Sequence, residues 1–246
     1  MKIRVFDEAR EMADEAANFV SKKIKDAIRE KGNANILLAT AGSQLLFLEA
    51  IQNKGIDWQK TTIFHLDEYK GISEQHAASF RKILKEHILN KINPGAFYLI
   101  RGDATNCEKE IARYEKLFKA YPIDVACIGI GENGHIAFND PHVADFNDPK
   151  TLKVVELDET CRQQQVGEGW FSSFADVPRE AFTLTIPAIL QSKSISCVVS
   201  GSQKADAVYK TIHGEISTSC PASILRTHSD TILFLDAGSA SKSNVD

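Results

Sequence analysis

Three segments of this 246-residue sequence combine small residues with side chains that can hold an anion or move a proton. The first, Thr40-Ala41-Gly42-Ser43, directly follows the apolar run 36–39 and precedes an amphipathic stretch. Small residues let backbone N–H groups approach an anion, and the N-terminus of a helix adds a favourable dipole. The same residues also suit a tight strand-to-helix turn in which Ser43 caps the helix. An anion-binding loop and a plain turn are therefore equal alternatives for this segment.

The second segment, His65-Leu66-Asp67-Glu68-Tyr69, contains two adjacent carboxylates after the apolar run 62–64. A carboxylate held beside a substrate can act as a general base. A solvated turn is the more common reason for an isolated Asp-Glu pair. The pair therefore indicates chemistry only in combination with the other segments.

The third segment runs from Gly129 to Pro141 and follows the apolar run 125–128. Its glycines permit a close approach of the backbone to a ligand. His135 stands between Asn133 and Asp140, which can fix its tautomer or tune its proton affinity near neutral pH. A dinucleotide-binding loop is disfavoured, because the glycines do not form GxGxxG at a helix start and no acidic partner follows about 20 residues on.

The elements that must position these segments alternate along the chain. Short apolar runs predict strands at residues 3–6, 36–39, 62–65, 125–128, 152–155, 195–199 and 231–235. Helical spacing of apolar residues predicts helices at 9–30, 45–51, 79–89, 108–120 and 203–212. This alternation indicates βαβ units and a mostly parallel sheet, in which ligands bind at the carboxyl ends of the strands. We expect the small, polar tail 239–246 to be loose.

Composition limits the function classes. With 29 Lys and Arg against 33 Asp and Glu, the net charge of −4 gives no reason to expect nucleic acid or an acidic membrane surface as a partner. The five cysteines form no CxxC pair, which disfavours a disulfide framework or zinc knuckle and favours a reducing compartment. The N-terminus lacks an apolar signal core, and no apolar run is long enough for a membrane span. We therefore expect a cytoplasmic protein.

Five motifs resemble, in the same order, those of glucosamine-6-phosphate deaminases. Residues 65–69 look like their (N/H)-(L/M)-D-E-Y element, and 129–141 resemble G-x-G-x-(N/D)-G-H-I-x-F-N-(E/D)-P. Residues 177–185 are similar to V-P-x-x-A-x-T-x, 201–205 to G-x-x-K-A, and 221–230 to a late family segment. The resemblance spans roughly residues 3–236. One such motif is weak, whereas five in collinear order are specific.

The resemblance implies a single α/β domain over residues 1–246, a Rossmann-like three-layer sandwich with a mostly parallel central sheet and a lid at roughly 149–180. It implies conversion of glucosamine-6-phosphate and water to fructose-6-phosphate and ammonia, with no metal or organic cofactor. The expected partner is a small sugar phosphate, and a homo-oligomer is left open. The short segment after the last strand favours a member without allosteric control.

Family matching also implies roles for individual residues. Asp67 matches the general base, which moves a proton from C2 to C1 through an enolamine-like intermediate. His135 matches the histidine that assists ring opening, and Asp140 its carboxylate partner. Many relatives have Glu at that place, so the shorter Asp140 is expected to need a shifted backbone or a water to reach His135. Asn133 stands where relatives have Asp or Asn, and it can orient the histidine without exchanging protons.

For the substrate's phosphate, the resemblance implies binding by Lys204 and by the amides of Ala41, Gly42 and Ser43, and Thr40 and Gly131 are also expected to contact the substrate. Two departures from the family pattern concern this function. Ala41 replaces a usual glycine, which costs on the order of 1 kcal/mol or more if that position needs a positive φ.

The second departure is in the lid. The family's N-x-R-(F/Y)-F arginine is missing from residues 166–171, and Arg162 is the nearest substitute. Since an arginine grips phosphate in a bidentate way, this departure leaves the identity of the sugar open more than the reaction type. Gln163, Gln164, Gln165 and Trp170 suggest a hydrogen-bonding pocket wall, although at least one of these glutamines fits a solvated helix face better.

Three alternatives remain. The first is the same chemistry on another amino-sugar phosphate, such as galactosamine-6-phosphate. The second is a 6-phosphogluconolactonase, disfavoured because those enzymes continue G-H with T-A-S-L-F-P and lack a D-E-Y element. The third is a non-catalytic sugar-phosphate sensor, disfavoured because Asp67, His135 and Asp140 are all present.

Overall fold

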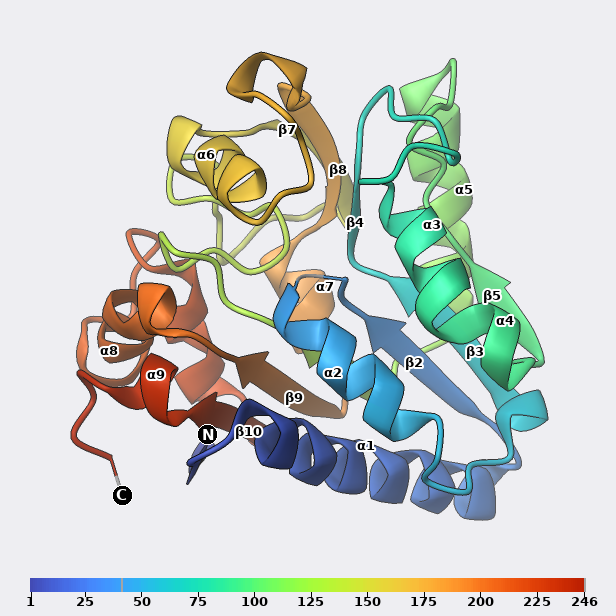
Figure 1. Ribbon diagram of the computed structural model, residues 1–246. Helices are drawn as coiled ribbons and strands as arrows, with labels where there is room; N and C mark the ends of the chain where they lie inside the picture. Colours follow the sequence, from blue (N-terminus) through green and yellow to red (C-terminus); the bar gives the residue numbers. More distant parts are fainter. Residues whose placement is uncertain (41, 246) are drawn as a thin grey trace.

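The computed structural model describes residues 1–40 and 42–245, and in these residues seven short strands form a fully parallel central sheet (Figure 1). The strand order is β1-β10-β9-β6-β2-β3-β5. The strands are β1 (Lys2–Phe6), β2 (Ala34–Leu38), β3 (Thr61–His65), β5 (Ala96–Tyr98), β6 (Val125–Ile128), β9 (Ser194–Val199) and β10 (Thr231–Asp236). Every residue of β2, β6 and β9 is buried, as expected for strands covered on both faces.

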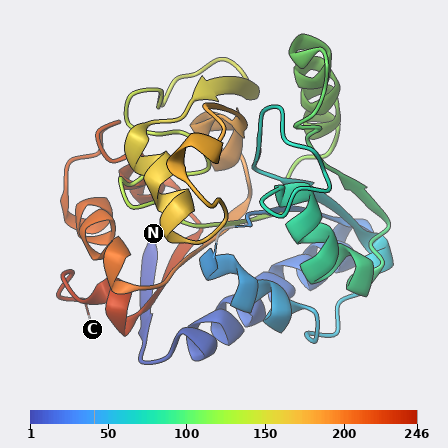
Figure 2. The same ribbon diagram turned by 45° about the horizontal axis from the view of Figure 1, so that its top comes forward.

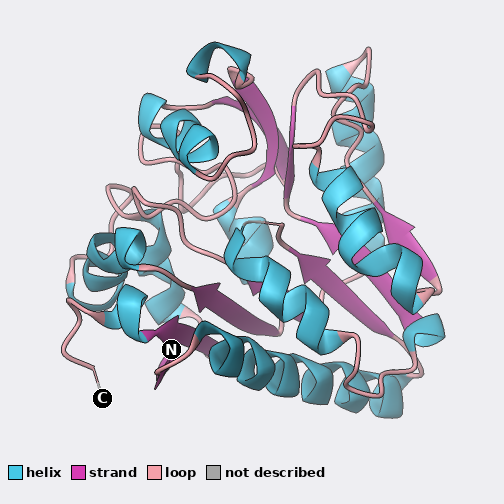
Figure 3. Ribbon diagram, viewed as in Figure 1, coloured by secondary structure: helices cyan, strands magenta, loops and turns pink. Residues whose placement is uncertain are grey.

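Helices cover both faces of this sheet, so the predicted three-layer α/β sandwich is confirmed (Figure 3). Successive residues of a strand point to opposite faces. In β2, Ile36 and Leu38 therefore enter one hydrophobic core, whereas Leu37 enters the other. The first core is covered by α1 (Ala9–Lys31), α2 (Gly42–Ile51), α3 (Phe80–Leu84) and α4 (Asn90–Ile92). The second is covered by α5 (Cys107–Ala120), α7 (Ile186–Leu190), α8 (Ala205–His213) and α9 (Ala237–Ala240).

A small antiparallel sheet stands above the carboxyl ends of the central strands (Figures 1 and 2). It has the order β4-β8-β7, and its strands are β4 (Asp67–Tyr69), β8 (Glu180–Leu184) and β7 (Leu152–Glu156). The expected lid, residues 149–180, contains β7 and α6 (Glu159–Gly167). Because β7 pairs with β8, and β8 pairs with β4, this segment is tied directly to the strand that begins at Asp67.

Short helical turns complete the path of the chain. A π-helical turn, Lys85–Leu89, joins α3 to α4, so the single helix predicted at 79–89 is interrupted and continues to Ile92. The 3-10 turns are Trp58–Lys60, Phe174–Asp176, Ser202–Lys204 and Pro221–Thr227. No helix in residues 1–40 and 42–245 has the length and apolar character that crossing a membrane requires.

The expectation of a loose tail is wrong for Ser239 and Ser243, whereas Ser241, Lys242 and Asn244 are exposed. Ser239 is buried, and its hydroxyl donates a 2.8 Å hydrogen bond to the carbonyl of Val199. Ser243 is also buried, and its carbonyl lies 2.8 Å from Nε2 of His213. Ser239 can be buried because its hydroxyl bonds to a backbone carbonyl inside the fold, whereas Ser243 is held through its own carbonyl. Asp246 lies outside the described residues.

Candidate active site

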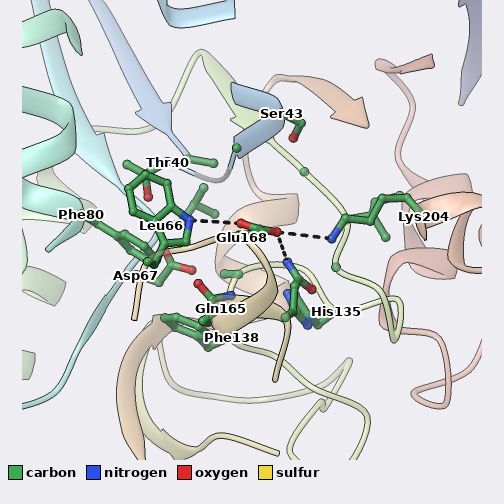
Figure 4. Close-up of a pocket in the computed structure, with 18 of the residues that line it drawn as sticks. Thr40, Ser43, Leu66, Asp67, Phe80, His135, Phe138, Gln165, Glu168 and Lys204 are labelled. Atoms are coloured by element: carbon green, nitrogen blue, oxygen red, sulfur yellow. Dashed lines mark hydrogen bonds and ion pairs between the residues drawn. The ribbon is translucent and has the colours of Figure 1, made fainter. Parts of the chain in front are cut away.

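A cavity of about 210 Å³ opens where the central strands end beneath α6, and all three sequence segments meet there (Figure 4). Its walls come from the β2–α2 connection, the start of β4, the glycine-rich loop after β6, the lid helix and the loop after β9. The lining residues that carry polar or flexible groups are Thr40, Gly42, Ser43, Asp67, Gly129, Gly131, His135, Gln164, Gln165, Glu168, Trp170, Ser200, Gln203 and Lys204.

Asp67 is the cavity's buried carboxylate. It begins β4 and pairs with Thr183 of β8, which holds its backbone at the cavity wall. Asp67 is only 8% exposed. Burial, and to a lesser degree the negative charge of Glu68, raises the pKa of Asp67 well above the ordinary aspartate value. A carboxyl group with a raised pKa can accept a proton and retain it long enough to return it.

Glu68 points away from the cavity and serves the fold. Its carboxylate accepts hydrogen bonds from Ser79 Oγ at 2.8 Å and from the backbone N–H groups of Phe80 and Arg81 at 3.1 and 3.0 Å. It also lies 3.4 Å from Nε of Arg81. These contacts hold the free N–H groups at the start of α3, and so fix Phe80 in the cavity wall. Of the Asp-Glu pair, Asp67 alone lines the cavity.

His65, at the end of β3, is buried behind this wall. Burial, with the positive charges of Arg81 and Arg113, lowers the pKa of His65 to about 3, so the ring is neutral. Its backbone is fixed by Tyr114, whose hydroxyl donates to the His65 carbonyl at 2.6 Å. His65 therefore positions the strand that leads to Asp67, and it does not line the cavity.

His135 and Asp140 meet directly on the opposite wall. Nδ1 of His135 lies 2.9 Å from Oδ1 of Asp140, although off the line of a good hydrogen bond. Asn133 donates to the same oxygen at 2.9 Å and to Asp158 at 3.0 Å. Burial alone would raise the pKa of Asp140, but the contacts with His135 and Asn133 outweigh it and lower the pKa. The ionised Asp140 can thus orient and stabilise a protonated His135.

The backbone between His135 and Asp140 bends sharply, which explains how the shorter aspartate reaches the ring without a bridging water. Ala137 has a φ of 52°, in the left-handed region. Asn139 is fully buried and holds this turn by donating to the carbonyls of Ile136 and Leu184, at 2.9 and 2.8 Å. Of the two routes expected for Asp140, the direct 2.9 Å contact excludes a bridging water, and a backbone shifted relative to the relatives stays a prediction.

The glycine at position 131 is required by the histidine ring. A Cβ added to Gly131 would lie 2.1 Å from ring atoms of His135. The backbone N–H of Gly131 also donates to the His135 carbonyl at 3.0 Å. Gly131 therefore lines the cavity as the surface on which the ring of His135 packs.

The end of the cavity that is expected to bind an anion consists of the start of α2 and Lys204. Helix α2 begins at Gly42, so Ser43 lies in its first turn and not at its cap, contrary to the turn alternative. Thr40 is buried, and its hydroxyl has no partner among the described residues. Burial lowers the pKa of Lys204, and the nearby carboxylate of Glu168 partly offsets that effect. Ala41, also expected in this loop, lies outside the described residues.

Arg162 does not reach the cavity. Its guanidinium Nη2 donates to the carbonyls of Phe174 and Val177, at 2.8 and 3.0 Å, and the group stacks 3.9 Å from the centre of the Phe174 ring. The structure thus places Arg162 under the outer turn of the lid, where it holds the loop after α6. It does not bring Arg162 together with Lys204.

Two of the three glutamines of α6 do line the cavity, and the third is the expected solvated one. Gln163 is exposed. The hydroxyl of Tyr69 donates to Oε1 of Gln165 at 2.6 Å, which occupies the acceptor and leaves the amide nitrogen as the group that can donate to a ligand. Gln164 accepts from the Glu132 backbone at 3.2 Å and donates to Glu168 at 2.7 Å. Glu168 also lines the cavity, and the sequence-based expectations gave it no role.

One group of metal-ligand types lies in the site. The ligand atoms of His135, Asp140 and Cys161 are within 4.8 Å of one another, and all three residues are buried. However, two ligands about 2 Å from a zinc ion in tetrahedral geometry stand more than about 3 Å apart. The 2.9 Å contact between His135 and Asp140 is that of an acid–base pair and would have to open for an ion. The expected absence of a metal stays a prediction.

A buried carboxylate facing a His–Asp pair, beneath a lid on a parallel α/β sheet, defines an enzyme of the acid–base class. Residues 7–234 match the sequence profile of the family described as glucosamine-6-phosphate isomerases/6-phosphogluconolactonases. The chain belongs to this family, as its five motifs predicted.

Curated relatives agree with this assignment. A glucosamine-6-phosphate deaminase of Clostridium novyi (strain NT) is 37% identical, covering 98% of this chain and 100% of the relative. One of Lacticaseibacillus paracasei is 33% identical over 98% of each chain. A solved structure of a monomeric glucosamine-6-phosphate deaminase superposes with a TM-score of 0.90 at 33% identity, over 98% of this chain and 100% of that one. A 6-phosphogluconolactonase from Shewanella baltica OS155 has a TM-score of 0.80 at 18% identity, over 96% and 98%, which shows a shared fold.

Proposed function

We propose that this enzyme isomerises and deaminates an amino-sugar 6-phosphate, converting glucosamine-6-phosphate and water into fructose-6-phosphate and ammonia. The observation that carries the proposal is the placement of Asp67. This buried carboxylate shares one small cavity with His135 and with the anion-binding end at Lys204. The relatives that are a third or more identical over nearly the full chain are named for this reaction.

The cavity can divide the proton transfers between its two walls. On one wall, His135 exchanges a proton with the ring oxygen as the sugar opens, and the ionised Asp140 stabilises the charged imidazole. On the other wall, ionised Asp67 removes the proton from C2 of the open aldehyde while O1 takes a proton from the substrate's own ammonium group, which gives an enolamine. Returning that proton to C1 leaves an imine at C2, and water then replaces the nitrogen and releases ammonia.

The phosphate would lie at the far end of the cavity. Gly42 and Ser43 contribute free backbone N–H groups at the start of α2, and Lys204 contributes a cation. The unpartnered hydroxyl of Thr40 is a further donor. The amide of Gln165, oriented by Tyr69, lies on the Asp67 side of the cavity and suits a sugar hydroxyl (Figure 4).

A second candidate substrate is the galactosamine epimer. Arg162 is engaged with the backbone of its own loop, so the selection between the two epimers is left to other groups of the cavity. We also propose that the enzyme works in the cytoplasm, a location that suits its five free cysteines.

Ammonia release from purified protein tests the function, with glucosamine-6-phosphate and galactosamine-6-phosphate assayed side by side. We expect release from the first, abolished in Asp67→Asn. Release from the galactosamine compound alone would keep the mechanism and change the substrate. Hydrolysis of 6-phosphogluconolactone without ammonia release from either sugar would overturn the proposal.

A further inference from the structure

The lid places a carboxylate inside the cavity, at the end where a phosphate is expected. Glu168 follows α6 directly, and its side chain is 23% exposed. In the close-up it lies between Asp67 on one side and Lys204 on the other (Figure 4). A carboxylate that faces the binding end of an enzyme for anionic substrates opposes the charge of its ligand, and this conflict needs an explanation.

The carboxylate of Glu168 lies among the groups that would hold a phosphate. Its Oε1 is 3.9 Å from Nζ of Lys204. Its Oε2 reaches over the start of α2, where a Cβ built at Gly42 would be 3.9 Å away. The side chain therefore stands between the cation and the helix N-terminus, the two sources of positive potential at this end of the cavity.

The bonds that hold Glu168 come from its own lid. Nε2 of Gln164 donates to Oε1 at 2.7 Å, and Nε1 of Trp170 donates to Oε2 at 3.1 Å. The distance to Lys204 is too long for a direct hydrogen bond, so that attraction is electrostatic only. A phosphate carries more charge than the carboxylate and can therefore replace Glu168 beside Lys204. Gln164 and Trp170 belong to the lid, so they can stay bonded to Glu168 when it moves away from Lys204.

We infer that Glu168 is an internal anion that competes with the phosphate of the substrate, and so sets the enzyme's affinity and its selection for strongly anionic ligands. The inference rests on the proposed function for the identity of the ligand. A weakly charged or neutral sugar cannot displace the carboxylate from Lys204, whereas a phosphate can. Binding then requires the segment of the lid that carries Glu168 and Trp170 to shift.

Calorimetric binding of inorganic phosphate and of glucose-6-phosphate tests this inference without requiring turnover. Glu168→Gln keeps the size and an acceptor oxygen, and we expect it to tighten the binding of both ligands about tenfold. The matched control is Glu159→Gln, which removes one charge from the exposed side of the same helix and should leave affinity unchanged. Equal or weaker binding of both ligands to Glu168→Gln would overturn the inference.

A comparison with glucosamine-6-phosphate separates another role for the same residue. If Glu168 binds the amino group of the substrate, the variant would bind glucosamine-6-phosphate more weakly and inorganic phosphate as before, and this result would also overturn the inference. The two proposals fail separately. Tighter phosphate binding without any ammonia release would remove only the deaminase function, whereas ammonia release with unchanged phosphate affinity would remove only the role of Glu168.

Tryptophan fluorescence provides a measurement that does not depend on the folding of Glu168→Gln. The chain has two tryptophans, and Trp58→Phe leaves Trp170 as the only reporter. Because Trp170 donates to Glu168, its emission should shift as inorganic phosphate is added. Emission that stays constant while calorimetry shows bound phosphate would contradict the displacement.

Discussion

His135 Nδ1 lies 2.9 Å from Asp140 Oδ1, although the chain carries the shorter of the two acidic side chains at position 140. The direct contact depends on the left-handed turn at Ala137 and on the buried amide of Asn139, which holds that turn. The relationship matters because an ionised Asp140 both selects the ring orientation and stabilises the imidazolium form.

Removing the charge of Asp140 should therefore impair catalysis more than folding. Asp140→Asn keeps the shape, but it cannot stabilise a protonated His135, and we expect kcat to fall about 100-fold or more. Steady-state ammonia release measures the effect. His135→Gln is the companion variant, and a double variant no slower than either single one would show that the two residues act as a unit. An Asp140→Asn enzyme with normal kcat would contradict this role.

Asp67 should make activity depend on pH and should weaken the fold at neutral pH. Its pKa is raised by burial and by Glu68, so the active, ionised form is lost as pH falls through a higher value than that of an ordinary aspartate. The stability contribution has the opposite sign. A raised pKa in the folded state favours folding below the unfolded value of about 3.9, and this advantage is lost as pH rises through the folded value.

We therefore expect Asp67→Asn to abolish activity and yet to raise the midpoint of thermal unfolding at neutral pH. The gain should disappear toward pH 3, where the carboxyl group is protonated in both states. The acid limb of the pH profile of kcat/KM for the unaltered enzyme gives the working pKa of the free enzyme. An acid limb at the ordinary aspartate value, together with no gain in stability, would mean that Asp67 is not desolvated.

Glu68, the neighbouring residue, should behave in the opposite way. Glu68→Ala removes the acceptor for the start of α3 and leaves the buried Arg81 without one of its partners. We expect a loss of about 3 kcal/mol in the free energy of unfolding, measured by denaturant titration. Asp67→Asn in the same experiment is the matched control. A Glu68→Ala protein as stable as the parent would show that its bonds contribute nothing net.

The parallel sheet could be predicted because its strands carry their own signal. The run at 125–128 is apolar throughout and coincides with β6, since a strand buried on both faces has to be apolar on both. β4 gave no such signal. Asp67, Glu68 and Tyr69 are extended only because they pair with residues of β8, more than a hundred positions away. Local pattern cannot reveal a partner at that distance.

The sequence predicted the site residues whose role depends on residue type. The prediction failed for residues whose role depends on their local hydrogen bonds. Asp67, His135 and Lys204 line one cavity, as their motifs suggested. Arg162 was chosen because it is the nearest arginine, but backbone carbonyls of the following loop engage its guanidinium. Glu168 was missed because a carboxylate beside an anion site conflicts with simple charge matching, and only its contacts with the lid make its position intelligible.

Replacing Arg162 by methionine should lower stability, whereas replacing Lys204 by methionine should lower the affinity for phosphate. Arg162→Met removes two bonds to carbonyls and the stacking on Phe174, so we expect about 1–3 kcal/mol less stability. Its affinity for inorganic phosphate should be unchanged within error, since the side chain does not line the cavity. Lys204→Met should lower that affinity about 10- to 100-fold, because it removes a cation from the anion-binding end. Calorimetry measures the phosphate affinity of both variants, and denaturant unfolding measures their stability. If Arg162→Met lost phosphate affinity as strongly as Lys204→Met, the lid would have to rearrange and bring this arginine to the ligand.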